Sequence, residues 1–205
     1  MFRSQRWVAP VLCFVIIEAI IDANTGSVLP TYAASAAALL FIATWLAIVV
    51  ANNEDPVQRE VTVVAAGSHA RVRVANLMTA YLAAVLLGLV GLIGPPLASS
   101  QGVRPRDLAA GAVAHAVTAL AGVVLGTLCS RPIIRRTAWA LLIAVVLDLA
   151  DVVVPNGPPT RQILVLFNEV HPGRLALYLV LVAVETVAIG AVVVVAALRL
   201  ARLRS

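Results

Sequence analysis

Six long apolar runs dominate the sequence, separated by short stretches rich in proline, glycine and arginine. A helix needs roughly 20 mainly apolar residues to cross the hydrocarbon layer of a membrane. The runs that approach this length cover residues 7–22, 31–51, 74–93, 108–128, 137–154 and 175–198. We therefore predict an all-α polytopic membrane protein with six spans in a single transmembrane domain, residues 1–205. The first and fifth runs are short, so we expect those helices to be tilted, broken or only partly exposed to lipid.

Composition excludes a water-soluble body for most of the chain. Hydrophobic residues make up 61% of the 205 residues and charged residues only 12%, with a mean hydropathy of +1.00. Soluble domains carry about 25% charged residues. The formal net charge of +5 comes from arginines that mostly flank the apolar runs. The expected partner is therefore the lipid bilayer, and nucleic-acid binding is not expected.

The arginines fall unevenly on the two sides that alternate loops define. Four lie on one side, Arg104, Arg106, Arg161 and Arg174. Eleven lie on the other side: Arg3, Arg6, Arg59, Arg71, Arg73, Arg131, Arg135, Arg136, Arg199, Arg202 and Arg204. Cytoplasmic loops carry the excess of basic residues in membrane proteins. We therefore predict a multi-pass protein of the cell membrane with both termini in the cytoplasm.

The cytoplasmic segment 52–76, between the second and third spans, has the pattern of a capped amphipathic helix. Asp55, Pro56 and Gln58 stand where an N-cap, a first helical residue and a capping-box partner belong. One apolar stripe follows, formed by Val57, Val61, Val64 and Ala65. We expect Gly67 to end this helix and Ser68 to cap the next. Such a helix either anchors on the membrane surface or docks a cytoplasmic protein.

The same segment resembles the corresponding loop of ABC-2-type transporter permeases. The resemblance lies in Asp55-Pro56-Val57-Gln58-Arg59-Glu60, Ala66-Gly67-Ser68, Arg71-Val72-Arg73 and Asn76-Leu77. It implies the membrane subunit of an ATP-driven exporter of a hydrophobic or amphipathic compound, working as a homodimer or heterodimer with a second six-span chain. It also implies that a separate ATP-binding subunit docks on Asp55, Gln58, Arg59, Glu60, Arg71 and Arg73.

The chain has no G-x-x-x-x-G-K-[ST] phosphate loop, so ATP and Mg would be bound by the partner subunit. We accordingly predict no enzymatic activity, and no catalytic, cofactor or metal residue in this chain. The outer segment 155–174 holds a short apolar stretch, 161–167, between proline-containing turns. The resemblance implies a re-entrant helix at this place, and the alternative is a segment lying flat on the membrane.

Five carboxylates lie within or at the ends of the apolar runs, Glu18, Asp22, Asp148, Asp151 and Glu185. Charges inside a membrane usually face a protein interior or a wet cavity. We expect the three aspartates to reach the outer surface, and Glu18 and Glu185 to lie deeper. His115 is either a partner of Glu185 or a packing residue.

These groups leave two alternatives to the exporter open. One is a small proton- or ion-coupled carrier that uses Glu18, Glu185 and His115. The other is a non-transporting scaffold subunit of a membrane complex. Gly122 and Gly126 form a small-xxx-small pair, which predicts a close helix contact without identifying the partner helix.

Overall fold

The computed structural model describes residues 5–24, 26–53, 56–99, 103–130, 134, 136–155, 158–169 and 175–202, and these residues form helices joined by short turns. A single 3₁₀ turn, Gln5–Trp7, leads into the first helix. The α-helices are α1 Val8–Ala23, α2 Val28–Ala51, α3 Pro56–Ala66, α4 His69–Ala98, α5 Pro105–Leu128, α6 Thr137–Val153, α7 Pro159–Glu169 and α8 Leu175–Arg202. The prediction of an all-α chain is confirmed.

Each of the six apolar runs forms a helix, but only some of these helices are long enough to span a membrane unaided. Among the described residues, four helices have the length and hydropathy required: α2, α4, α5 and α8. Helix α1 has 16 residues and α6 has 17. At 1.5 Å per residue each is shorter than the hydrocarbon layer, which is about 30 Å thick. The structure therefore supports a membrane-embedded helical protein with four candidate spans.

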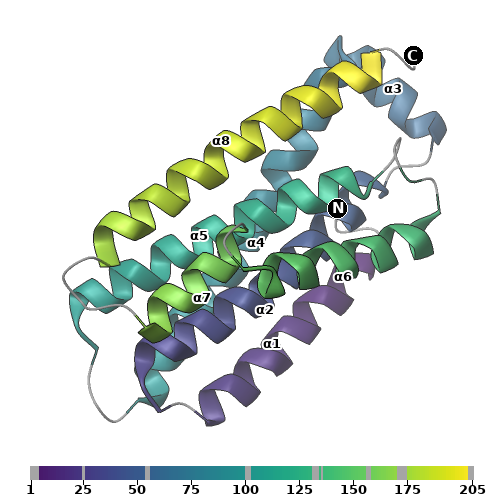
Figure 1. Cartoon of the computed structure of the whole chain (residues 1–205). Coiled ribbons are helices and arrows are strands. Elements are labelled where there is room, and N and C mark those ends of the chain that lie inside the picture. The colour runs from purple at the N-terminus through teal and green to yellow at the C-terminus, as the bar shows by residue number, and fades with distance from the viewer. Residues whose placement is uncertain are drawn as a thin grey trace.

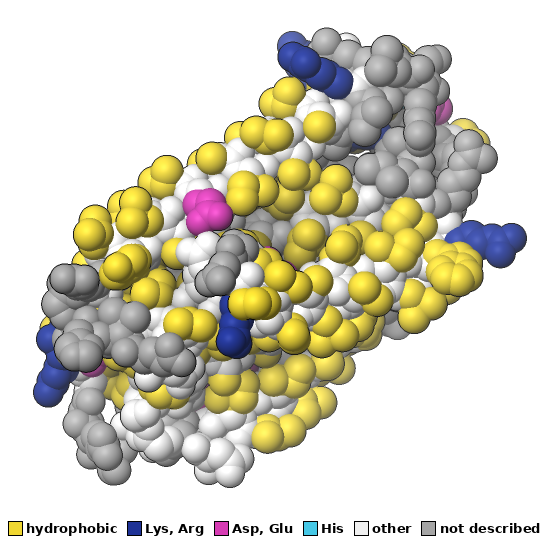
Figure 2. Space-filling view, viewed as in Figure 1, with side chains coloured by type: hydrophobic (Ala, Val, Ile, Leu, Met, Phe, Trp, Pro, Cys, Tyr) yellow, Lys and Arg dark blue, Asp and Glu magenta, His cyan; other side chains and the backbone are white. Residues whose placement is uncertain are grey.

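The long helices run side by side along one axis, and the short α3 lies at the end of the bundle where α8 finishes (Figure 1). Helices α2 and α5 form its centre, since about two thirds of their most apolar stretches are buried, against about one fifth for α4 and α8. Most outward-facing side chains of α4 and α8 are apolar, and many of them are large. Figure 2 shows one such face, mainly hydrophobic, with most of its basic side chains towards the ends and one acidic and one basic side chain away from them. This distribution suits lipid around the middle and water at both ends.

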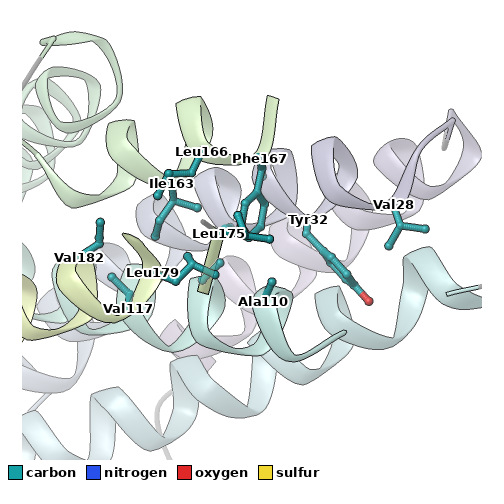
Figure 3. Close-up of a cluster of buried hydrophobic side chains, with 13 residues drawn as sticks. Val28, Tyr32, Ala110, Val117, Ile163, Leu166, Phe167, Leu175, Leu179 and Val182 are labelled. Atoms are coloured by element: carbon teal, nitrogen blue, oxygen red, sulfur yellow. The ribbon is translucent and has the colours of Figure 1, made fainter. Parts of the chain in front are cut away.

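Helices α6 and α7 pack against successive stretches of α2. Ala140 and Ala144 of α6 are buried with Ile48, near the end of α2. Ile163 and Phe167 of α7 are buried with Tyr32, near its beginning, as Figure 3 shows. The chain from α6 to α7 thus follows α2 along most of its length, interrupted by a turn. A short helix is present within 155–174, and one of its faces, with Thr160, Ile163, Leu166 and Phe167, is buried against the bundle.

The turn between α3 and α4 has the predicted geometry. Gly67 adopts a positive φ of 71°, a conformation in which glycine is favoured at the end of a helix. The Ser68 hydroxyl accepts hydrogen bonds from the backbone N–H groups of Ala70 at 3.1 Å and Arg71 at 3.2 Å. The Arg71 guanidinium in turn donates to the Ala66 carbonyl at 3.1 Å. Both predicted signals, the stop at Gly67 and the cap at Ser68, are confirmed.

The expected end of the third span is wrong. We expected this span to end at residue 93, but α4 continues through Pro95 and Pro96 to Ala98. Proline fixes φ near the helical value and removes only its own backbone donor. The last turn therefore stays helical, and the backbone N–H of Ser99 still donates to the Pro95 carbonyl at 2.9 Å.

Candidate functional site

The contact between α2 and α5 brings the polar side chains of the bundle together. A methyl group added at Gly122 would lie 2.6 Å from the Leu40 carbonyl oxygen, and one at Gly126 would lie 2.5 Å from the Thr44 carbonyl oxygen. Only glycine permits backbones to approach this closely. The predicted small-xxx-small contact is therefore confirmed, and its partner is α2 of the same chain.

A first polar group, which we call the Glu18 cluster, consists of Glu18 of α1, Ser35 of α2 and His115 of α5. All three are buried, with exposed fractions of 2%, 0% and 4%. Ser35 Oγ lies 2.8 Å from Glu18 Oε1 and 2.8 Å from His115 Nε2. His115 Nδ1 lies 2.7 Å from the Gly111 carbonyl oxygen. The hydroxyl therefore bridges a carboxyl group and an imidazole across three helices.

Helix α4 covers this cluster with glycines. A methyl group at Gly91 would collide with Ser35 Oγ and lie 3.3 Å from Glu18 Oε2. Gly94 faces Asp22 in the same way, and Gly88 faces His115. The i, i+3, i+6 spacing of these glycines, visible in the sequence as a packing signal, therefore makes room for acidic and imidazole side chains.

Tyr32 closes the cluster on the side nearer the start of α2. Its ring lies edge-on to that of His115, with centroids 6.0 Å apart, and its hydroxyl donates to the Leu92 carbonyl at 3.1 Å. Neither Tyr32 nor Ser35 was among the predicted site residues. Their signal in the sequence is a regular series of hydroxyl side chains within one apolar run: Thr31, Tyr32, Ser35 and Thr44.

A second polar group, the Asp148 cluster, consists of Thr44 of α2, Asp148 and Asp151 of α6 and Thr160 of α7. Thr44 Oγ1 lies 2.8 Å from Asp148 Oδ1 and 3.1 Å from the Gly122 carbonyl oxygen. Asp151 lies beside the amide and hydroxyl of Thr160, although neither its Oδ2 nor Thr160 Oγ1 forms a hydrogen bond with the described residues. This cluster lies where α6 gives way to α7.

The expectation that Asp148 and Asp151 reach the outer surface is wrong. Their exposed fractions are 2% and 8%. Asp148 and Asp151 share one helix face, as their spacing predicts, and that face is turned towards α2 and α7. Asp22 is partly exposed, near the end of α1.

A small cavity of about 70 Å³ adjoins this second cluster. Asp151 and Pro159 contribute to its wall at the break, and the remaining wall is formed by Ala121, Val124, Leu125, Thr186, Ile189 and Gly190 of α5 and α8. Its volume corresponds to about two water molecules at roughly 30 Å³ each. It is too small for a hydrophobic or amphipathic cargo in this conformation.

Glu185 does not join either cluster. It is exposed on α8, and its Oε2 accepts a hydrogen bond of 3.0 Å from Gln162 Nε2 of α7. Of the two alternatives for His115, the pairing with Glu185 is wrong, because His115 contacts Ser35 and the Gly111 carbonyl instead. The run that contains Glu185 is apolar on every face, so the sequence pattern did not indicate that its carboxylate would point outward.

The predicted docking residues lie on or beside α3. Gln58 and Glu60 are exposed, as is Arg71, and Arg73 is partly buried. Asp55 and the side chain of Arg59 lie outside the described residues. The apolar stripe also faces outward: Val57, Val61 and Val64 are 73%, 66% and 81% exposed. Among the described side chains of α3, Val63, beside the stripe, is the buried one.

Within the described ranges, no three His, Cys, Asp or Glu side chains gather in a way that could hold a metal ion. Comparisons with protein-family models, curated proteins and solved structures gave no match. Functional inference for this chain therefore rests on its own residues and geometry.

Proposed function

We propose that the chain is the membrane-spanning subunit of an ATP-driven exporter, with an organisation similar to that of ABC-2-type permeases. The proposal rests mainly on the position and the exposed side chains of α3. This helix lies at one end of the bundle (Figure 1), packs mainly against α4, and exposes both an apolar stripe and the polar side chains of Gln58 and Glu60. An exposed helix with both kinds of side chain is a suitable docking surface for a second protein.

In this proposal the end of the bundle that carries α3 faces the cytoplasm, with both termini of the chain, in the cell membrane. The arginine excess on that side of the sequence supports this orientation. Helices α6 and α7 together cross the membrane as the fifth span, so the six apolar runs give six spans. Helix α7 lies where a re-entrant helix was expected. Its packing against the beginning of α2 supports a position inside the bundle, in the outer half of the membrane.

The partner subunit supplies ATP, Mg and hydrolysis, and a second six-span chain, identical or similar, completes the translocation path. The apolar outward faces of α4 and α8 offer a surface for that second chain. A path lined by Ala, Val and Leu favours a hydrophobic or amphipathic cargo.

The test is co-purification of the full chain from its own cells in a mild detergent. We expect a protein with a phosphate loop to be recovered with it. Val64→Asp and the pair Gln58→Ala with Glu60→Ala should each weaken that association about tenfold, which corresponds to a loss of about 1.4 kcal/mol. Arg104→Ala, at the opposite end of the bundle, is the matched control and should leave recovery unchanged.

Unchanged recovery and unchanged ATP hydrolysis in all α3 variants would contradict docking at α3. If all of the chain is found in the membrane fraction and no ATPase co-purifies with it, α3 is a membrane-surface anchor instead.

The Glu18 cluster favours one other function, a proton- or ion-coupled carrier. In that case Glu18 and His115 act without Glu185, since Glu185 is exposed on α8. Transport would follow a pH or cation gradient in vesicles without an ATPase, and would be lost in Glu18→Gln. The scaffold alternative loses its predicted partner surface, because Gly122 and Gly126 are already occupied by α2.

A further inference from the structure

The Ser35 hydroxyl stands between two groups that compete for its hydrogen. Its oxygen lies 2.8 Å from both Glu18 Oε1 and His115 Nε2. A hydroxyl group carries one hydrogen, so it can donate to only one of them at a time. The other contact must then be made by a hydrogen that belongs to Glu18 or to His115.

The second ring nitrogen of His115 decides which tautomer is present. Nδ1 lies 2.7 Å from the Gly111 carbonyl oxygen, which can only accept, so Nδ1 carries a hydrogen. In a neutral imidazole Nε2 then has none and can only accept. An ionised Glu18 beside a neutral His115 would therefore present two acceptors to a single hydrogen, and one of the two short contacts would be repulsive.

One additional proton removes this conflict in either of two ways. On Glu18, it lets the carboxyl group donate to Ser35 while Ser35 donates to His115. On His115, it lets the imidazolium donate to Ser35 while Ser35 donates to the carboxylate. Both arrangements leave the cluster without net charge. A second proton would not break these contacts, because it can sit on Glu18 Oε2 while Oε1 still accepts from Ser35, but it would leave a positive charge buried in the bundle.

We propose that Glu18, Ser35 and His115 form a binding site for a single proton inside the helix bundle. The site is independent of the exporter proposed above, since its argument uses only hydrogen bonds within this chain. The proton comes from water and is shared through Ser35, and no other bond is made or broken.

The surroundings of Glu18 support this site independently. Glu18 is 2% exposed and its Oε2 has no hydrogen-bond partner among the described residues. The titratable groups that face the cluster are Asp22 of α1, one turn further along, and Tyr32 of α2. Gly88, Gly91 and Gly94 of α4 face the Glu18 cluster and its neighbour Asp22, and none of them carries a titratable side chain. No described arginine pairs with Glu18, so an ionised carboxylate would be buried without compensation, which is costly in a membrane protein.

A metal cation fits these groups less well than a proton. Calcium takes six to eight oxygen ligands, and magnesium requires near-octahedral oxygen coordination. This cluster offers one carboxyl group, one hydroxyl and an imidazole nitrogen. Asp22, the nearest further acid, faces Gly94 instead.

The test counts the protons on the full chain in lipid nanodiscs. Infrared spectroscopy detects a protonated Glu18 as a carboxyl C=O band that shifts in D₂O and is lost in Glu18→Gln. Nitrogen NMR with labelled histidine distinguishes a neutral His115 from an imidazolium. We expect the two measurements to add up to one proton. An ionised Glu18 with a neutral His115, or a protonated Glu18 with an imidazolium, would overturn the proposal.

Sharing through Ser35 is tested by Ser35→Ala, which should shift the Glu18 band or the His115 signal, whichever carries the proton. If neither signal moves, the two groups are not linked and the proposal is overturned. Glu185→Gln is the control and should leave both signals in place. If Glu18→Gln does not fold, the variants Asp22→Asn, Asp148→Asn and Asp151→Asn assign the Glu18 band by elimination. Displacement of the proton by added Na⁺ or Mg²⁺ would identify a cation site and overturn the proposal.

Discussion

The Glu18 cluster and the Asp148 cluster both place a carboxyl group against a hydroxyl of α2, yet the hydroxyls are bridged differently. Ser35 joins a carboxyl group to an imidazole from another helix. Thr44 joins a carboxyl group to the backbone carbonyls of Leu40 and Gly122. The Leu40 carbonyl belongs to the regular hydrogen bonding of its own helix. The Ser35 bridge therefore depends on three side chains at once, whereas the Thr44 bridge joins two side chains to a fixed backbone.

This difference separates a site whose proton can change position from a site that mainly stabilises the helix bundle. The proton of the Glu18 cluster can move through Ser35 between a carboxyl group and an imidazole, whereas Thr44 connects the Asp148 carboxyl group only to backbone carbonyls, which cannot take a proton. We expect substitutions in the second to act mainly on stability, and those in the first to act on protonation as well.

The largest effect is expected at the glycines that permit each cluster to form. Gly122→Ala would place a methyl group 2.6 Å from the Leu40 carbonyl oxygen, and a backbone cannot move aside. We expect a loss of about 3 kcal/mol of unfolding free energy. Gly91→Ala meets the side chains of the Glu18 cluster, which can move aside only by giving up the Ser35 bridge, so it should lose about 2 kcal/mol.

Thermal unfolding of both variants in one detergent measures this contrast. Gly190→Ala is the control, because its methyl group would lie 3.2 Å from a methyl group of Val124 and should change stability little. Equal losses of unfolding free energy in Gly91→Ala and Gly122→Ala would show that a side-chain neighbour and a backbone neighbour resist the added methyl group equally.

A smaller contrast is expected when the two hydroxyls are removed. Ser35→Ala leaves both Glu18 and His115 without their bridge, while Thr44→Val leaves only Asp148 without one. We expect losses of about 2 and about 1 kcal/mol, respectively, since each unsatisfied buried polar group costs about 1–3 kcal/mol and hydrogen bonds between membrane helices less. Chemical unfolding in micelles measures both. Thr118→Val, whose hydroxyl bonds only within its own helix, is the control. A larger loss for Thr44→Val than for Ser35→Ala would reverse the comparison.

The helices could be predicted from the sequence because their signals are local. Apolar length marks each long helix, Gly67 and Ser68 mark a stop and a cap, and the small-xxx-small spacing marks a close contact. The polar clusters could not be predicted in the same way. Asp148 and Asp151 are near the end of their run, which suggested exposure, and only the position of α7 beside α2 explains their burial. Likewise Ser35 is one small hydroxyl among alanines, and its role depends on α1 and α5 meeting it.

A third prediction concerns the break between α6 and α7, which has no counterpart at the Glu18 cluster. Asp151 lies beside the amide of Thr160 in the first turn of α7, where a carboxylate or amide oxygen can satisfy backbone donors. Asp151→Ala should lose about 1 kcal/mol, as for a missing N-cap, and Asp151→Asn much less. Hydrogen exchange of the α7 amides should rise in the alanine variant and stay near the original in the asparagine variant. Equal exchange in the two variants would show that Asp151 does not support α7.

The smallest effect is expected at Glu185, the carboxylate that belongs to neither cluster. It is exposed and its hydrogen bond comes from Gln162, which an amide at position 185 could equally accept. Glu185→Gln keeps this contact and creates no cavity, so we expect it to change the unfolding free energy in detergent by less than about 0.5 kcal/mol. Glu18→Gln provides the contrast, because the buried amide must replace the carboxyl group within a three-way bridge. A larger loss of unfolding free energy in Glu185→Gln than in Glu18→Gln would mean that the Glu185 carboxylate is buried. The division of the carboxylates into two internal clusters and one outward-facing group would then be wrong.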